Sequence, residues 1–466
     1  MRGFFLGKIS IMLNPNPMLQ TIINADLVIE ARWIATVATN QSLLENHAVI
    51  IQAGVIVEVL PSIEAKQKYT ATSLVCLDDH VLIPGLINLH THAGMSLMRG
   101  IADDVPLMAW LNDHIWPIEQ AILSECYVQD ATLLACAEML SGGITTFNDM
   151  YFYPQAAAIA STQAGMRANL GLVVLEFPSA YASDADDYLQ KGIIAHDSWR
   201  NNPLLTSSIA PHAPYTVSNK TFESIVTYAE QLSLSIHTHL HETRDEIAQS
   251  EAQYGMRPIQ RMAELGLLGP NFVAAHGVHL LHHEIDTLAE YGCHIAHCPT
   301  SNLKLANGIA PVVQLLAQGV NVGLGTDGAA SNNRLDIFSE MRLSALLAKG
   351  LEGMNGHGDA TVIPAHQALA MATINAAKAI GLENKIGSIE VGKLADLTAV
   401  SLSDLATSPC YDPISHLVYA CGREHVTHTW VAGELRYNNG LYANIEPNEL
   451  KEIINTWQPK LWQHKH

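Results

Sequence analysis

The sequence predicts an α/β protein: a (β/α)8 barrel with a small β-sandwich domain formed from both ends of the chain. Two observations predict this fold. The middle of the chain holds eight short apolar runs, each followed by a stretch that can be helical, and strand-rich blocks stand before and after them. After a long first interval, the runs recur at the spacing of βα units. A doubly wound sheet is the alternative, but the chain has no GxGxxG after a first strand and no GxxxxGK(S/T).

The two terminal blocks alternate apolar and polar residues. Stretches such as DLVIEARWIATVA and HAVIIQAGVIVEVLP fall within 19–80, and GKLADLTAVSL and THTWVAGELRYNNG follow residue 387. Such alternation predicts antiparallel strands. Because chain ends commonly lie close together, we expect one β-sandwich from 19–80 and 385–440, the barrel over 81–384, and a helical tail over 441–466.

Residues 1–18 begin with MRGFFLGKISIML, which is similar to a short signal core. Lys8 interrupts it, however, and an Asn-Pro repeat follows in place of a small-residue cleavage site. We expect either a disordered extension here or a start codon placed too early, with Met12 or Met18 as the true start. No other run approaches the ~18–20 apolar residues of a membrane span.

The eight runs of the middle region carry polar residues where a barrel would place a site. The runs cover 82–92, 143–150, 168–177, 204–213, 234–242, 272–280, 293–302 and 320–331. Barrel active sites lie at the carboxyl ends of the strands, and five of the runs end in polar candidates. One such residue is ordinarily a core residue, but the agreement of several favours a site. The candidates are His90, His92, His212, His239, Glu242, His276 and Asp327.

The first run ends in HTH, with His90 and His92 two positions apart. Residues two apart on a strand share a face, so both imidazoles can aim at one metal ion. Among 23 histidines such a pair alone is weak evidence. With one histidine of the fifth run and Asp327, it makes an N3O donor set suited to zinc or ferrous iron, which would activate water. The fourth run has no Lys, Asp or Glu to bridge a second ion, so we expect one divalent metal ion.

The fifth run leaves the third histidine open. His237, His239 and His241 share a face, and the position of the strand end favours His239 or His241. Glu242 has the opposite parity but lies where the strand should end, so it can turn into the site as a proton carrier. The alternative is an N-cap of the helix that begins near Thr243.

Five motifs, taken together in order, resemble the amidohydrolase superfamily: LIPGLINLHTH, HLHET, AAHGVHL, HCPTSN and GLGTDGAASNN. They are most similar to the branch that contains S-methylthioadenosine/S-adenosylhomocysteine deaminases and triazine chlorohydrolases. The resemblance implies a barrel with a β-sandwich from both termini. It also implies that His90, His92, His239 and Asp327 bind the metal, that Glu242 shuttles a proton and that His276 orients the attacking water. His237 and His241 then become neighbours that pack or support the ligands.

The resemblance also implies substrate contacts. A glutamate in a WPxE-like segment would bind ribose, which gives Glu119, and a histidine in a PHxPY-like segment would contact the substrate, which gives His212. The alternatives are a surface carboxylate and a core histidine. Ser331 would touch the base or Asp327. Trp110 and Met108 would form an apolar wall, or would pack inward as part of an amphipathic helix.

One departure affects the substrate. Some relatives that accept S-adenosylhomocysteine meet its carboxylate with an arginine near the end of the third strand. Here that stretch, LGLVVLEF, has no cation, and Arg167 precedes the strand. This leaves methylthioadenosine and adenosine ahead of S-adenosylhomocysteine.

Composition limits the partners and the compartment. The formal net charge of -20 argues against nucleic acid and anionic membranes, and the seven cysteines form no CxxC pair, as expected for reduced thiols in a cytoplasmic protein. Together with the family resemblance, which implies a deaminase of small adenine nucleosides, these limits lead us to expect a cytoplasmic enzyme that uses zinc, with ferrous iron as the second choice. By resemblance it would be a homo-oligomer. The alternatives are the same site acting on a free base or a triazine, and a non-catalytic barrel that serves as a scaffold.

Overall fold

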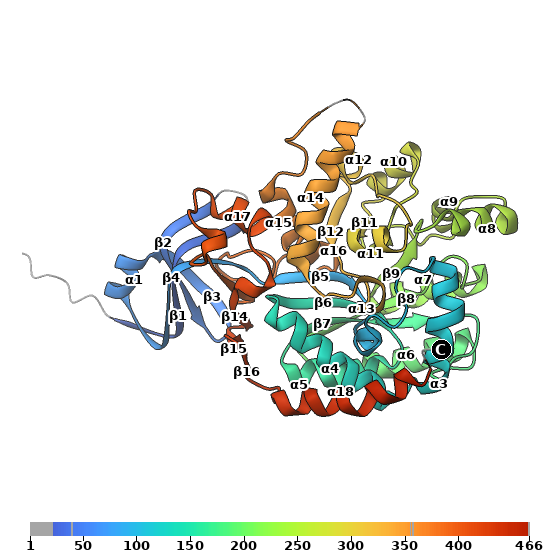
Figure 1. Ribbon diagram of the computed structural model, residues 1–466, viewed down its shortest axis with the longest axis horizontal. Coiled ribbons are helices and arrows are strands. Elements are labelled where there is room, and N and C mark those ends of the chain that lie inside the picture. Colours follow the sequence, from blue (N-terminus) through green and yellow to red (C-terminus); the bar gives the residue numbers. More distant parts are fainter. Residues whose placement is uncertain (1–21, 39–40, 355, 357, 465–466) are drawn as a thin grey trace, which may run out of the picture.

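The computed structural model describes residues 22–38, 41–354, 356 and 358–464. The extension expected over 1–18 lies outside them. The strands of this part of the chain form two eight-stranded sheets (Figure 1), one a nearly closed parallel barrel and the other built from the amino- and carboxyl-terminal parts of the chain. The predicted fold class is confirmed.

The barrel strands pair in chain order, each parallel to the next. Each predicted run overlaps one of them, to within one residue of containing it, and nearly all their residues are buried because the sheet is covered on both faces. Between the last strand and the first, the Asp327 amide donates to the His90 carbonyl at 2.9 Å. The strands are β5 (Leu86–Thr91), β6 (Ile144–Tyr151), β7 (Arg167–Val174), β8 (Leu205–Pro211), β9 (Ser235–Leu240), β10 (Phe272–His276), β11 (His294–His297) and β12 (Asn321–Leu324).

Helices follow the strands, and most of them cover the outside of the barrel. Several begin at a side chain that accepts an orphan backbone N–H, as Ser124, Asp184, Ser218 and Thr243 do. The helices are η1 (Ala93–Met98), α2 (Leu107–Ala109), η2 (Trp110–Ile115), α3 (Trp116–Ile122), α4 (Glu125–Ser141), α5 (Pro154–Ala164), α6 (Ala185–Trp199), α7 (Asn219–Leu232), α8 (Arg244–Tyr254), α9 (Pro258–Glu264), α10 (His282–Glu290), α11 (Pro299–Lys304), α12 (Val312–Ala317), α13 (Ala329–Asn332), α14 (Ile337–Met354), α15 (Ala365–Met371) and α16 (Ile374–Ala379).

The second sheet joins strands from both terminal parts of the chain in the order β16-β15-β14-β13-β4-β1-β2-β3. All its pairs are antiparallel except β1 with β4. One apolar cluster includes Ile29, Val49, Leu397 and Trp430, so the two parts share a core. The elements are β1 (Ile23–Ala38), β2 (Gln41–Gln52), β3 (Val55–Pro61), α1 (Ser62–Lys68), β4 (Tyr69–Pro84), β13 (Leu397–Ser401), η3 (Leu405–Thr407), α17 (Pro413–Tyr419), η4 (Arg423–His425), β14 (Val426–Val431), β15 (Glu434–Asn438) and β16 (Leu441–Tyr442).

Among the contacts that tie the outer parts to the barrel are a buried ion pair and an aromatic pair. The buried Arg167 guanidinium, at the start of β7, donates to both carboxylate oxygens of Asp396 at 2.9 and 3.1 Å. The last helix, α18 (Pro447–Trp462), runs beside α4 (Figure 1), and its Trp457 ring meets Tyr127 edge to face. Among the described helices, none has the length and apolar character needed to cross a membrane.

Candidate active site

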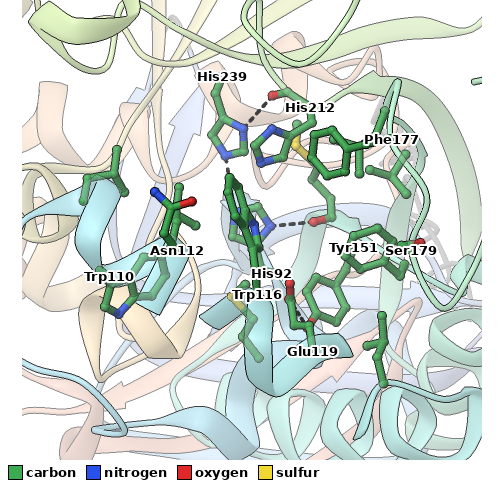
Figure 2. Close-up of a pocket in the computed structure, with 18 of the residues that line it drawn as sticks. His92, Trp110, Asn112, Trp116, Glu119, Tyr151, Phe177, Ser179, His212 and His239 are labelled. Atoms are coloured by element: carbon green, nitrogen blue, oxygen red, sulfur yellow. Dashed lines mark hydrogen bonds between the residues drawn. The ribbon is translucent and has the colours of Figure 1, made fainter. Parts of the chain in front are cut away.

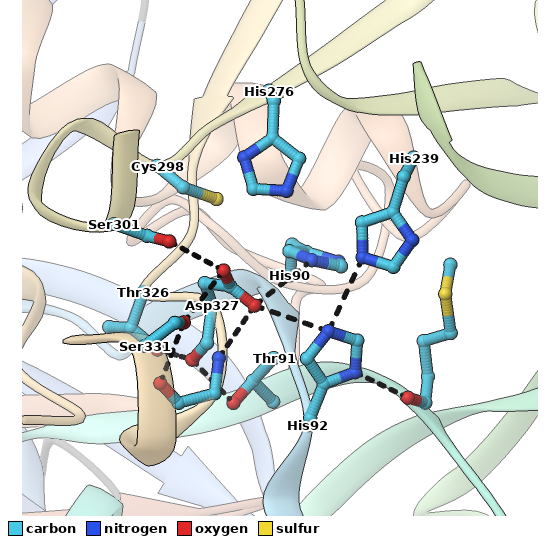
Figure 3. A network of polar contacts seen from close by, with 12 residues as sticks. His90, Thr91, His92, His239, His276, Cys298, Ser301, Thr326, Asp327 and Ser331 are labelled. Carbon is cyan, nitrogen blue, oxygen red and sulfur yellow. Dashed lines mark hydrogen bonds and ion pairs between the residues drawn. The ribbon is translucent and has the colours of Figure 1, made fainter. Parts of the chain in front are cut away.

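Three histidines and one aspartate converge at the carboxyl ends of the barrel strands. The ligand atoms of His90, His92, His239 and Asp327 all lie within 4.8 Å of one another, and all four residues are buried. Asp327 Oδ1 is 3.5 Å from His90 Nε2 and 3.2 Å from His92 Nε2, and His239 Nε2 is 3.3 Å from His92 Nε2 (Figure 3).

These separations test whether the group fits a metal ion. Zinc bonds of about 2.0–2.1 Å in a tetrahedron place neighbouring ligand atoms about 3.3–3.4 Å apart, close to the observed values. His90 Nε2 is also buried and has no hydrogen-bond partner in the described part of the chain, which is unusual for a buried polar atom. The donor set therefore fits one divalent ion, as the sequence predicted.

The backbone at the site is specialised. His276 and Asp327 both have left-handed backbone conformations, with φ of 72° and 61°, which are uncommon for non-glycine residues. Gly325 allows the last strand to approach the first, because a Cβ there would lie 2.8 Å from the His90 amide nitrogen. The GLGTDG segment thus brings Asp327 against the histidine pair.

The rings of two ligand histidines are held by backbone carbonyls. His92 Nδ1 donates to the Met150 carbonyl, and His239 Nδ1 donates to the His212 carbonyl at 2.7 Å. Because a carbonyl only accepts, the hydrogen must sit on Nδ1 and Nε2 is left free for a metal. Both rings are therefore set in the tautomer that ligates.

Asp327 is the most heavily hydrogen-bonded group of the site (Figure 3). Its Oδ2 accepts from Ser301 Oγ at 2.6 Å and Ser331 Oγ at 2.8 Å, and its Oδ1 accepts from the Gly328 amide. Burial alone would raise the pKa of Asp327, but the adjacent imidazoles of His90 and His92 hold it well below its usual value. The group is thus held as a carboxylate.

Glu242 and His276 lie together beside the metal ligands. Glu242 Oε2 is 3.7 Å from His276 Nε2, and Glu242 Oε1 accepts from Asn307 Nδ2 at 2.8 Å. Burial raises the pKa of the Glu242 carboxyl, against the opposing effect of His276, and so favours its protonated form. His276 is oriented by its own hydrogen bond, from Nδ1 to Asn302 Oδ1 at 2.8 Å.

A second buried carboxylate shapes the turn that carries Glu242. The two oxygens of Glu246 accept the backbone N–H groups of His241 and Glu242 at 2.7 and 2.8 Å. The helix that follows is capped by Thr243, so the N-cap alternative for Glu242 is wrong. His241 points elsewhere, with its Nε2 accepting from the Ile259 amide.

A cavity of about 640 Å³ opens over these groups (Figure 2), within the ~300–1,000 Å³ range of small-molecule sites. His92, His239, Glu242, His276 and Asp327 line its metal end. Its wall is largely aromatic and aliphatic; among the described residues that line it, none is Lys or Arg. Arg167 is held by Asp396 at the opposite end of β7, where the sequence placed it.

Glu119 lies in the cavity wall, and its side chain is buried rather than on the surface (Figure 2). Its Oε1 accepts from the Tyr151 hydroxyl at 2.6 Å. Burial raises the pKa of Glu119 to about 7, against the opposing effect of the Tyr151 hydrogen bond. The carboxyl therefore changes charge near neutral pH.

Of the other predicted substrate contacts, two line the cavity and two do not. His212 lines the cavity with its ring 4.9 Å from that of His239, so the core-histidine alternative is wrong. Trp110 also lines the cavity, whereas Met108 does not. Ser331 is hydrogen-bonded to Asp327 and is absent from the cavity wall.

Sequence reasoning missed several supporting residues. Tyr151, Asn307 and Glu246 are bonded to site groups but belong to none of the ligand motifs. Ser301 and Asn302 stand inside the HCPTSN motif, which could have identified them.

Comparisons with known proteins agree with this geometry. The profile of the amidohydrolase family matches residues 81–436. A protein of Teredinibacter turnerae, named 5-methylthioadenosine/S-adenosylhomocysteine deaminase, is 44% identical over 94% of this chain and 98% of its own. One of Saccharophagus degradans with the same name is 44% identical over 94% and 97%. The crystal structure of an adenosine deaminase from Xanthomonas campestris with bound zinc is 43% identical, has a TM-score of 0.92, and is matched over 95% of this chain and 100% of its own.

Proposed function

Because this chain belongs to the amidohydrolase family, we propose that it is a metal-dependent hydrolytic deaminase of adenine nucleosides, which forms the hypoxanthine nucleoside and ammonia. The observation that carries the proposal is one cavity with an N3O metal-ligand cluster, an adjacent acid-base pair at one end and a buried carboxylate, Glu119, in its wall. The two bacterial relatives named deaminases and the zinc-bound adenosine deaminase support it.

His90, His92, His239 and Asp327 would hold the ion, which we propose is zinc, with ferrous iron as the second choice. When bound, such an ion supplies one kind of chemistry: it lowers the pKa of water from ~15.7 to about 7 and so provides a nucleophile at neutral pH.

Glu242 supplies the proton that activates the base. Its burial favours the protonated carboxyl, which donates to N1 of the purine and lowers the electron density at C6. Asn307 holds one oxygen of the carboxyl so that the other can face the substrate.

His276 orients the attacking water, and Asp327 accepts a proton from it. His276, fixed by Asn302, hydrogen-bonds this water and directs it at C6. Asp327, a carboxylate beside the cavity, accepts a proton from the water and passes it to the departing amine. Ammonia then leaves, and Asp327 is again a carboxylate. The second proton of the water returns to Glu242, which gave its own proton to N1, so both groups regain their starting protonation states.

Glu119 would bind the ribose hydroxyls. Tyr151 occupies one position on Oε1, and the remaining lone pairs can accept from a substrate hydroxyl. His212 and Trp110 would contact the base or sugar from the cavity wall.

The cavity wall favours an uncharged 5′ substituent. An amino-acid carboxylate carries a charge that is costly to bury without a partner, and the described wall residues offer no Lys or Arg. Aromatic residues such as Trp116 and Phe177 would suit a thioether methyl group. We therefore place methylthioadenosine and adenosine ahead of S-adenosylhomocysteine.

We also propose that the protein is a cytoplasmic homo-oligomer. Its partner would be a small nucleoside rather than nucleic acid or a membrane. The net charge of -20 supports the class of partner, and the absence of disulfides between the described cysteines supports the compartment. The homo-oligomer rests on the family resemblance alone.

An ultraviolet assay of purified, metal-analysed protein tests the proposal. Adenosine, methylthioadenosine, S-adenosylhomocysteine, guanine and a chlorotriazine are compared, with one equivalent of metal expected and the first two nucleosides turned over fastest. Glu242→Gln should lower turnover by ~10²–10⁴, while Glu125→Gln, a change at an exposed carboxylate, should not.

Three results would reject it. Turnover of guanine or the chlorotriazine alone would support the alternative substrate class. A chain without stoichiometric metal and without activity would support a scaffold. Near-normal turnover by Glu242→Gln on every substrate would show that the mechanism is wrong.

A further inference from the structure

Of the three ligand histidines, His90 is held differently from His92 and His239. His92 and His239 donate to carbonyls, which fixes their tautomers. His90 Nδ1 instead lies 3.0 Å from Nε2 of another imidazole, that of the fully buried His237. Two neutral rings can share this hydrogen in either sense, so the pairing alone does not determine which nitrogen of His90 is free.

His237 continues into a column of polar side chains inside the barrel. Asn148 Nδ2 lies 3.2 Å from His237 Nδ1, Asn169 Nδ2 donates to Asn148 Oδ1 at 2.8 Å, and Thr206 Oγ1 donates to Asn169 Oδ1 at 2.9 Å. Barrel interiors are ordinarily filled by branched apolar side chains, and polar groups there are costly unless each is paired.

As the side chains stand, every member of the column donates toward His90. Asn148 Nδ2 donates to His237 Nδ1, which places the His237 hydrogen on Nε2, where it is donated to His90 Nδ1. His90 must then carry its own hydrogen on Nε2, the atom that faces Asp327. A nitrogen that carries hydrogen cannot ligate a metal.

If the hydrogen bonds of the column run in the opposite direction, His90 Nε2 carries no hydrogen and is free to ligate. His90 Nδ1 then donates to His237 Nε2, His237 Nδ1 donates to the Asn148 amide oxygen, and both amides turn over so that Asn169 donates to Thr206. Thr206 can accommodate this because it borders a second cavity, of about 550 Å³, at the amino-terminal end of the strands. The reversal gives up the 2.8 Å bond from Asn148 Nδ2 to the Leu89 carbonyl, a loss that metal binding must offset.

We propose that His237 and Asn148 are positioning residues for the metal, and that metal binding reverses the direction of this hydrogen-bonded column. The proposal rests on the metal site of the proposed function. Its tests use zinc alone, without substrate, so a chain that binds zinc but deaminates nothing would reject the function and leave this inference standing.

Zinc affinity, measured by competition with a chromophoric chelator, gives the first test. His237→Leu should bind zinc ~10- to 100-fold more weakly, the usual effect of losing a partner of a ligand. His237→Gln should stay close to wild type, because its amide oxygen can accept from His90 Nδ1. His294→Leu is the control, since His294 is also buried on a barrel strand but pairs with Asn321 and Pro270.

Either of two results would overturn the role of His237: wild-type affinity in His237→Leu, or equal loss in His237→Leu, His237→Gln and His294→Leu. The last pattern would indicate damage to the barrel alone.

Histidine tautomers in ¹⁵N-labelled protein give the second test, with His237→Gln used to assign the His237 signals. Adding zinc should move the hydrogen of His237 from Nε2 to Nδ1, although His237 does not belong to the ligand cluster. In Asn148→Asp, whose carboxylate only accepts, His237 should carry its hydrogen on Nδ1 before zinc is added. An unchanged His237 tautomer in the wild-type protein on zinc addition would refute the reversal.

Discussion

Replacing Glu119 with alanine should separate nucleosides from free bases. Glu119 is buried in the cavity wall, and its Oε1 already accepts from Tyr151. If its remaining lone pairs bind the ribose, Glu119→Ala removes a hydrogen bond that adenosine makes and adenine cannot. Glu125→Ala, an exposed carboxylate at the start of α4, is the matched control.

The size of the effect follows from the charge and burial of the group. A hydrogen bond to a charged acceptor contributes about 1.5–3 kcal/mol, and each ~1.4 kcal/mol is tenfold in rate. One lost ribose bond therefore lowers kcat/KM for adenosine by about 10- to 150-fold. The Tyr151 hydroxyl also loses its acceptor, which places the result toward the upper end.

The pH dependence gives an independent check. Burial raises the pKa of Glu119 to about 7, and the ionised form is the better acceptor. The contribution of Glu119 to kcat/KM should thus be present above pH 7 and should fade as the pH drops through it. Tyr151→Phe removes a bond that favours the ionised form, so this transition should move to higher pH.

Initial rates on adenosine and adenine from pH 5.5 to 9 test both points. We expect Glu119→Ala to reduce kcat/KM for adenosine, to leave adenine unchanged and to remove the transition near pH 7. An equal loss on both substrates, or no loss on either, would refute the assignment of Glu119 to ribose.

Three further predictions concern the proton carrier Glu242, the buried ion pair between Arg167 and Asp396, and the metal. Asn307→Leu removes the donor to Glu242 and should lower kcat by about tenfold, the equivalent of one ~1.4 kcal/mol hydrogen bond, with little change in KM; an unchanged kcat in steady-state assays would exclude this positioning role. Asp396→Asn breaks the buried pair with Arg167 and should cost about 3–5 kcal/mol of unfolding free energy, measured by urea denaturation, while Asp197→Asn, in an exposed pair, should cost under about 1 kcal/mol. Chelation should abolish activity and added zinc should restore it, and full activity in metal-free protein, verified by elemental analysis, would contradict the site.

Local periodicity accounts for how much of this fold could be predicted. Each barrel strand is a short apolar run whose neighbours in space are also its neighbours along the chain, so counting runs was enough to predict the barrel. Spacing of two on a strand likewise placed His90 and His92 on one face. The candidates at strand ends met because parallel strands bring their carboxyl ends to the same side.

The sequence by itself thus determined the barrel, the terminal sheet and the residue types of the metal cluster, since these depend on short periods and strand order. Spacing alone left the choice between the histidines of one face open, and the family resemblance pointed to His239. The tertiary structure shows that His239 reaches the cluster, while His237 contacts His90 across 147 positions of sequence. It alone revealed Tyr151 against Glu119 and Asn307 against Glu242. These contacts depend on how far along the barrel interior each side chain lies. That position is set by tertiary packing and cannot be read from the local sequence.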